Sequence, residues 1–227
     1  MKAEPLGSAF NRSDTDRLLS AIHTGTLIMQ KTRNAAAVVI LLLGAVGCAS
    51  MKPDMGPTAP MVQSMVAAWP TTSREVAMWA MQKYGAPTEA TATMLVWHNN
   101  GPWKRTIVYR DEVPHAFPGP HPDVMQQFID YRVPLERYDD MAMYDGSVVI
   151  ERTNGEMSAR CDKEEANFLA LNLANDIATG RRTVEDARAM YAREIMAFKQ
   201  GQGGPYTKGL QFSVPRGGTA DPDRPAM

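Results

Sequence analysis

The alternation of apolar and polar residues predicts two β-hairpins near the middle of the chain. The first joins residues 92–97 to residues 104–110, and the second joins residues 147–152 to residues 156–160. These stretches are rich in β-branched residues or alternate between apolar and polar positions, which is typical of half-buried strands. An Asn-Gly dipeptide lies between the members of each pair and favours the positive φ angles of a tight turn. The pattern therefore predicts an antiparallel sheet.

Helical periodicity predicts a helix before the first hairpin, within residues 70–87. Apolar side chains recur there at steps of three and four residues. Thr72 and Glu75 have the spacing of an N-terminal capping box, and Gly85 supplies the left-handed residue that ends many helices. We expect this helix to cover part of the sheet.

Two amphipathic stretches follow the second hairpin, at residues 162–180 and 183–198. Asp162 has the position of an N-cap for the first stretch, with Glu165 completing a capping box, and Thr183 has that position for the second. The link between them is too short for anything but an antiparallel return. The sequence therefore predicts a C-terminal αα-hairpin.

The residues between the two β-hairpins carry weaker patterns. Residues 111–123 contain four prolines and predict an irregular, stiff loop. Asp123 would cap a helix over residues 124–131, and a second short helix is expected over residues 134–144. Together these elements predict an α+β fold in which an antiparallel sheet, built from two β-hairpins, packs with an N-terminal helix and the αα-hairpin.

Composition sets the expected domain limits. A single α+β domain is predicted over residues 70–199. Residues 48–69 hold several prolines and little periodicity, which predicts a flexible tether, and the Gly- and Pro-rich residues 200–227 predict a disordered tail.

An apolar segment near the N-terminus predicts the compartment. Lys31 and Arg33 precede the uncharged stretch 35–47, which is shorter than the about 20 apolar residues that span a bilayer. This length is typical of a secretory signal. Residues 1–47 are therefore predicted to be a signal peptide, and Met29 is a better start than Met1 because residues 1–28 carry mixed charge.

The end of this segment, Val46-Gly47-Cys48, resembles the lipobox of bacterial lipoproteins, with Ala45 where leucine is commonest. The resemblance implies that Cys48 is lipidated and becomes the mature N-terminus. Ala49 after the cysteine implies sorting to the outer membrane, with the domain in the periplasm. The region 73–110 is similar to small outer-membrane assembly lipoproteins in its order of helix, Gly-x-Pro turn and strands, and the mature chain also resembles envelope lipoproteins with no assigned role.

The charge of the chain limits the classes of partner, and its cysteine content limits the possible thiol chemistry. Residues 49–227 carry 19 Lys and Arg against 22 Asp and Glu, which provides no basic field for nucleic acid. The expected partners are the membrane, through the lipid anchor, and an envelope protein. Cys161 is the one cysteine besides Cys48, and we expect it to be a small buried residue, with a reactive thiol as the alternative.

The best candidate for chemistry is the group His115, His121 and Asp123. Two imidazoles and a carboxylate are suitable ligands for zinc or a similar ion, and a proline-stiffened loop could hold them together. The alternative is that these residues only shape the loop. His98 would join the group only if the first hairpin turn lay beside it.

A second candidate is the acidic group formed by Glu136, Asp139, Asp140 and Asp145, which we interpret as a solvated helix face. The chain has no Gly-x-Ser-x-Gly elbow, phosphate-binding glycine loop, dinucleotide fingerprint or His-Glu-x-x-His pair. Ser147 lies in a predicted strand with no histidine near it in sequence. The sequence thus favours a lipid-anchored, non-catalytic interaction module that needs no cofactor, with a metal-binding protein or metal-dependent enzyme as the alternative.

Overall fold

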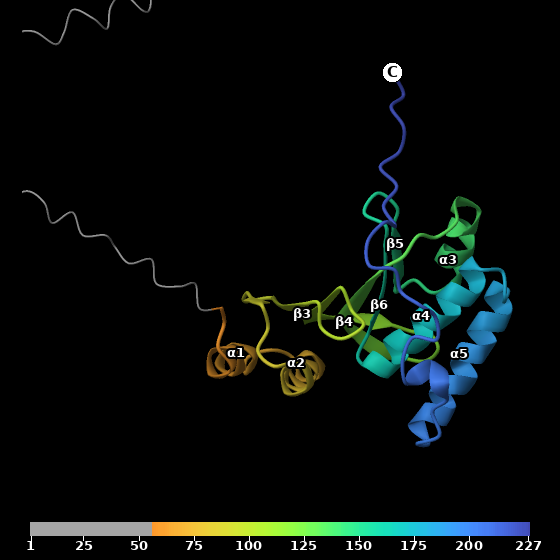
Figure 1. Ribbon diagram of the computed structural model, residues 1–227. Coiled ribbons are helices and arrows are strands. Elements are labelled where there is room, and N and C mark those ends of the chain that lie inside the picture. The colour runs from red at the N-terminus through yellow and green to blue at the C-terminus, as the bar shows by residue number, and fades with distance from the viewer. Residues whose placement is uncertain (1–55) are drawn as a thin grey trace, which may run out of the picture. The chain divides into compact units, whose positions relative to one another are not determined.

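The computed structural model describes residues 56–227, and these residues form an α+β domain around one six-stranded antiparallel sheet (Figure 1). The predicted fold class is confirmed. The strand order is β1-β2-β3-β4-β6-β5, and both predicted hairpins lie within it. The strands are β1 (Glu89–Ala90), β2 (Met94–His98), β3 (Arg105–His115), β4 (His121–Asp130), β5 (Val148–Glu151) and β6 (Glu156–Cys161).

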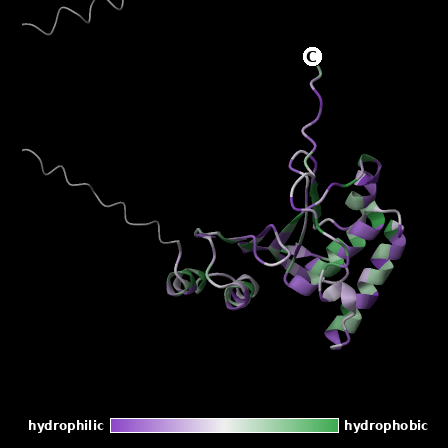
Figure 2. Cartoon of the chain, in the orientation of Figure 1, coloured by the Kyte–Doolittle hydropathy of each residue, from purple (hydrophilic) through white to green (hydrophobic). Residues whose placement is uncertain are grey.

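Two groups of helices pack against this sheet. Helix α2 contacts β3 and β4, whereas α4 contacts β6, β4 and β5 and lies beside α5 (Figure 1). Apolar residues run along most of α4, while α5 alternates between apolar and polar positions, as expected for an inner and an outer helix (Figure 2). The helices are α1 (Ala59–Val66), α2 (Thr71–Tyr84), α3 (Tyr138–Tyr144), α4 (Glu164–Ala178) and α5 (Val184–Lys199), with 3₁₀ turns η1 (Leu135–Arg137) and η2 (Pro205–Thr207).

The predicted αα-hairpin is confirmed as α4 and α5. Thr183 caps α5 by accepting a hydrogen bond from the Asp186 amide. Asp162, in contrast, does not cap α4, which starts after Lys163 without a side-chain cap. The Asp162 carboxylate instead accepts hydrogen bonds from the Cys161 thiol and the Lys163 ammonium.

The N-terminal helix is confirmed as α2, but its predicted capping box is wrong. Pro70 occupies the N-cap position and has no side-chain acceptor. Glu112, from strand β3, accepts hydrogen bonds from the Thr72 and Ser73 amides at 2.8 and 3.1 Å. A carboxylate at a helix N-terminus satisfies free amides and the helix dipole, so a distant strand provides the cap that the local sequence lacks.

The predicted tether is wrong in its C-terminal part. Residues 59–66 form α1, and Val62, Val66 and Trp69 are buried in a cluster with α2 and strands β2 to β4. Three apolar residues at helical spacing are enough to dock a two-turn helix on an existing core. The predicted signal peptide and Cys48 lie outside the described residues.

The predicted disordered tail is also wrong. Phe212 packs edge-on against Tyr131, and Thr219 donates a hydrogen bond to the Gly155 carbonyl. Asp221 forms ion pairs at 3.0 Å with Arg132 and Arg152. Because a few separate side-chain contacts hold this segment on the domain, its sequence needs no helical or strand periodicity.

The helix predicted over residues 124–131 is strand β4, and Asp123 therefore caps nothing. Much of the predicted loop 111–123 also belongs to strands β3 and β4. Strand β4 lies between β3 and β6, so pairing on both sides outweighs the local preference of the sequence. The short helix predicted over residues 134–144 is confirmed as η1 and α3.

Candidate metal site

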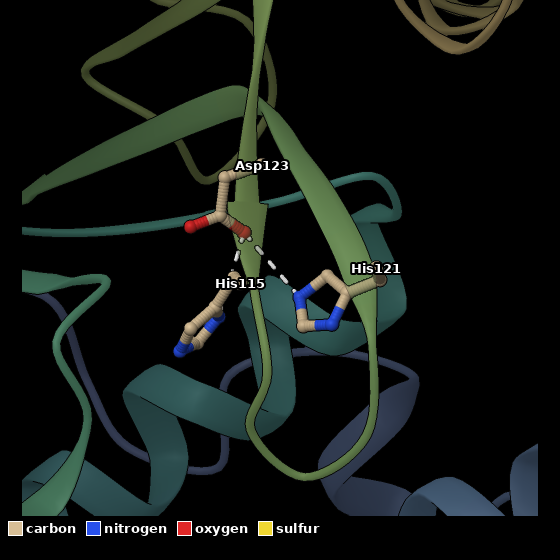
Figure 3. A group of neighbouring side chains, drawn as sticks. All are labelled: His115, His121 and Asp123. Carbon is tan, nitrogen blue, oxygen red and sulfur yellow. Dashed lines mark ion pairs between the residues drawn. The ribbon is translucent and has the colours of Figure 1, made fainter.

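The hairpin of β3 and β4 brings the three predicted ligands together. His115 lies directly opposite His121 in the strand register, and Asp123 follows His121 by two residues. Side chains opposite each other, and side chains two apart on one strand, project from the same face of a sheet. His115, His121 and Asp123 therefore converge, and Figure 3 shows both imidazole rings beside the carboxylate.

The sequence did not predict this hairpin, because its prolines indicated an irregular loop. Pro114 and Pro122 lie opposite each other, past a register shift between Val108 and Val113. The pairing of β2 with β3 reaches only Tyr109, and the pairing of β6 with β4 reaches only Met125. A missing amide donor costs little where no outer strand needs it, so the proline-rich ends of β3 and β4 still pair.

The three side chains offer ligand atoms that all lie within 4.8 Å of one another. Asp123 Oδ1 is 3.3 Å from His121 Nε2 and 3.7 Å from His115 Nδ1. The Asp123 side chain is only 2% exposed, while those of His115 and His121 are 18% and 16% exposed. The group is thus a buried carboxylate beneath two partly accessible imidazoles.

The outward nitrogen of each imidazole has its own partner. His121 Nδ1 lies 2.9 Å from the Gly119 carbonyl, and His115 Nε2 lies 3.5 Å from Asp145 Oδ1. These acceptors favour a proton on the outward nitrogens, so His121 Nε2 and His115 Nδ1, which face Asp123, are the nitrogens open to a metal ion that displaces any proton on them. Metal-binding histidines have this arrangement, in which the second ring nitrogen donates to a carboxylate or a backbone carbonyl.

The two oxygens of Asp123 have different environments. Oδ2 accepts a hydrogen bond from the Ser147 hydroxyl and lies 4.0 Å from Arg160 Nε. Oδ1 is buried and has no hydrogen-bond donor among the described residues, although both imidazoles approach it. A buried carboxylate oxygen without a donor is costly, and a cation between the imidazoles would satisfy it.

The electrostatics of the group favour positive charge. The Asp123 carboxylate, followed by the Cys161 sulfur, raises the pKa of His121 to about 11, although burial opposes this. Burial raises the pKa of Asp145, and the Ser147 amide and His115 act in the opposite direction. A proton on His121 and a metal ion would stabilise the same negative charge, so the two compete for one position.

The structure also places Ser147 Oγ 3.2 Å from His115 Nδ1, a contact that sequence spacing did not predict. With Asp145 on the other ring nitrogen, the three residues resemble a Ser-His-Asp arrangement in composition. However, Ser147 is only 7% exposed and donates its proton to Asp123. A nucleophile must reach a substrate, so these contacts orient the ligands instead.

The remaining candidates separate in the structure. Cys161 is a buried free thiol, as expected, and burial raises its pKa. Within the acidic group, Asp145 is buried beside His115, whereas Asp139 and Asp140 lie in the first turn of α3. The interpretation of a solvated face is therefore wrong for Asp145. His98 pairs with Glu89 and is not part of the metal-ligating group.

Comparison with family models, with curated proteins and with solved structures gives no match, so the site rests on its own geometry. Within residues 56–227, no helix is both long and apolar enough to cross a membrane.

Proposed function

We propose that this protein binds a divalent transition metal ion, with zinc the best fit, through His115, His121 and Asp123. The observation that carries the proposal is Asp123 Oδ1, a buried carboxylate oxygen that lacks a donor and faces two imidazole nitrogens. Zinc bonds of about 2.0–2.1 Å in a tetrahedron separate ligand atoms by about 3.3 Å. The oxygen-to-nitrogen distances of 3.3 and 3.7 Å are close to that value.

The ligand types support zinc over a hard cation. Calcium and magnesium prefer six or more oxygen ligands, whereas two imidazoles and one carboxylate suit zinc, iron and related ions. Three protein ligands leave a fourth position for water or a small molecule. The proposal covers metal binding and assigns no reaction to that position.

Three surrounding groups support the proposal by fixing the ligands. Asp145 and the Gly119 carbonyl hold the outward ring nitrogens, and Ser147 holds Asp123 Oδ2. Such partners set ring orientation and the basicity of the ligating nitrogen. Ser147 and Asp145 are accordingly positioning residues, since neither is assigned as a ligand.

Isothermal titration of the metal-stripped full chain with zinc chloride tests the proposal. We expect one zinc ion per chain, and we expect His121→Ala to weaken binding at least about 100-fold, because even outer partners of zinc ligands cost 10–100-fold. The matched control is His98→Ala, which removes a surface imidazole that pairs with Glu89 outside the group. The absence of zinc binding, or an equal loss in His98→Ala, would refute the site.

The proposed location is the cell envelope. The basis is the short apolar segment and its Val-Gly-Cys48 end, both outside the described residues. Lipidation at Cys48 would hold the metal-binding domain at a membrane, and the expected envelope-protein partner rests on that anchor alone. Mass spectrometry of the N-terminus isolated from cells tests this independently of zinc, since an unmodified Cys48 would exclude the anchor.

A further inference from the structure

A pocket of about 310 Å³ lies beside the hairpin that carries the candidate ligands, against helix α5. We call it the α5 pocket. Its walls include Pro118, His121, Cys161, Tyr191, Ile195 and Phe198. Its volume is at the lower end of the range for small-molecule sites, about 300–1,000 Å³, so any ligand would be small.

Most of the wall is apolar. Tyr191 is buried and Ile195 and Phe198 are half-buried along one side of α5. The proline-rich turn between β3 and β4 forms the opposite rim, with Pro118 and Pro122 among the lining residues. An aliphatic or aromatic body placed between these walls would lose its contact with water, which is the main source of affinity for such a molecule.

Aromatic contacts join the β3–β4 turn to helix α5 beside the pocket. The Phe117 ring lies 5.2 Å from the Tyr191 ring, and the Arg188 guanidinium stacks 3.9 Å from the centre of Phe117. These contacts fix the turn on α5. A ligand therefore meets walls that are already positioned, which reduces the entropy cost of binding.

The polar groups at the mouth favour an anion. Lys163 and Lys199 both line the pocket and are exposed, and Lys163 pairs with Asp162 at 2.8 Å. Lys199 has no ion-pair partner among residues 56–227. A lysine without a carboxylate partner at the mouth of an apolar pocket suits a ligand with an apolar body and one negative end.

We propose that the α5 pocket binds a small amphiphilic monocarboxylate, with its apolar body on Tyr191, Ile195 and Phe198 and its carboxylate at Lys199. The proposed carboxylate binding does not depend on metal binding, although His121 lines the pocket and is also a proposed metal ligand. The carboxylate lies at Lys199 and does not need the open fourth position on the metal ion. The pocket volume lies at the low end of the range for small-molecule sites and therefore suits a short carboxylate.

Sodium octanoate is the probe, and it is titrated calorimetrically into the full chain in excess EDTA. The chelator ensures that no metal ion binds the carboxylate, so failure of this proposal and failure of the metal site are distinguishable. We expect one octanoate per chain, and hexanoate should bind about tenfold more weakly because two buried methylenes are lost. No saturable octanoate binding at millimolar concentration would overturn the proposal.

Matched variants on α5 locate the ligand. Ile195→Trp fills the pocket and should weaken octanoate binding at least about tenfold. Met196→Trp introduces the same indole side chain at an exposed neighbouring position, where Met196 is 58% accessible, and it should leave binding unchanged. Equal affinities for the two variants would overturn the assignment to this pocket.

The charge of the ligand is tested separately. Lys199→Glu should weaken octanoate several-fold at low salt, whereas Arg193→Glu, an exposed change outside the pocket lining, should not. Octylamine should bind more weakly than octanoate. Tighter octylamine binding, or no difference between the two charge variants, would overturn the carboxylate assignment.

Discussion

Trp103 Nε1 donates a hydrogen bond of 2.7 Å to the buried carboxylate of Glu164, 61 residues further along the chain. Lys83 and Tyr84 from α2 donate to the same carboxylate, and Gln127 from β4 lies 3.3 Å from it. Glu164 is therefore the point at which α2, the first hairpin, the centre of the sheet and α4 are joined. The Glu164 carboxylate therefore links helix α2 to helix α4.

Replacing this carboxylate should destabilise the domain strongly. Glu164→Ala leaves the buried Trp103 donor without an acceptor and removes the carboxylate to which Lys83 and Tyr84 donate. We expect a loss of about 3 kcal/mol in the free energy of unfolding. Urea denaturation measures this loss. Glu165→Ala, at the half-buried neighbouring position, is the control and should change stability by less than about 1 kcal/mol. Similar losses in both variants would contradict the role of Glu164.

The Glu164 carboxylate also predicts how the stability of the domain depends on pH. Burial alone would raise the pKa of Glu164, but hydrogen bonds from Lys83, Tyr84 and Trp103 outweigh it and hold the pKa below its usual range. The unfolded chain has the ordinary glutamate pKa of about 4.3. The stabilisation is therefore complete above that pH and is lost as the pH falls through the lower, folded pKa.

Denaturation of the wild type and of Glu164→Gln between neutral and acidic pH tests this dependence. The stability of the wild type should fall more steeply below about pH 4.3, because only the wild type takes up a proton at this site on unfolding. Parallel pH profiles would contradict the assignment of the lowered pKa to Glu164.

The C-terminal segment should detach when Gly155 gains a side chain. Gly155 has a φ of 68°, and a Cβ there would collide with the Thr219 and Ala220 backbone. Gly155→Ala should therefore expose residues 215–227 to proteases and cost more than the about 1 kcal/mol expected from φ strain. Limited proteolysis combined with urea denaturation measures both effects.

Two other glycines serve as controls that separate φ strain from the collision with the Thr219 and Ala220 backbone. Gly101→Ala introduces a residue at a φ of 75° with no neighbour within 4 Å, so it reports strain alone. Gly146 has neither a positive φ nor a close neighbour, and Gly146→Ala should be neutral. Faster cleavage of the tail in Gly101→Ala than in Gly155→Ala would contradict the collision at Thr219.

Ser147→Ala should weaken zinc binding about 10- to 100-fold without removing a ligand, because it frees Asp123 Oδ2 from its hydrogen bond. Zinc titration gives the affinity, and circular dichroism checks the fold. Ser158→Ala is the matched control, since Ser158 is also buried and accepts a hydrogen bond from Gln126 away from the site. If both serine variants bind zinc as the wild type does, Ser147 has no positioning role.

Local signals in the sequence determined the elements that form from neighbouring residues. The second hairpin depends on a turn with its flanking strands, and α5 depends on its own periodicity and on Thr183, so both were predicted where they occur. The residue types of the metal group were also evident, because histidine and aspartate chemistry does not depend on the fold.

Where contacts between distant residues compete with local preference, only the tertiary structure decided which element forms. Strand β4 was predicted as a helix because its local sequence pattern does not show that β3 and β6 pair with it on either side. That strand also sets His115 opposite His121 and brings Ser147 and Asp145 beside them from a distant turn. The ligands could thus be named from the sequence, whereas their convergence required pairing energy that is shared across strands far apart in the chain.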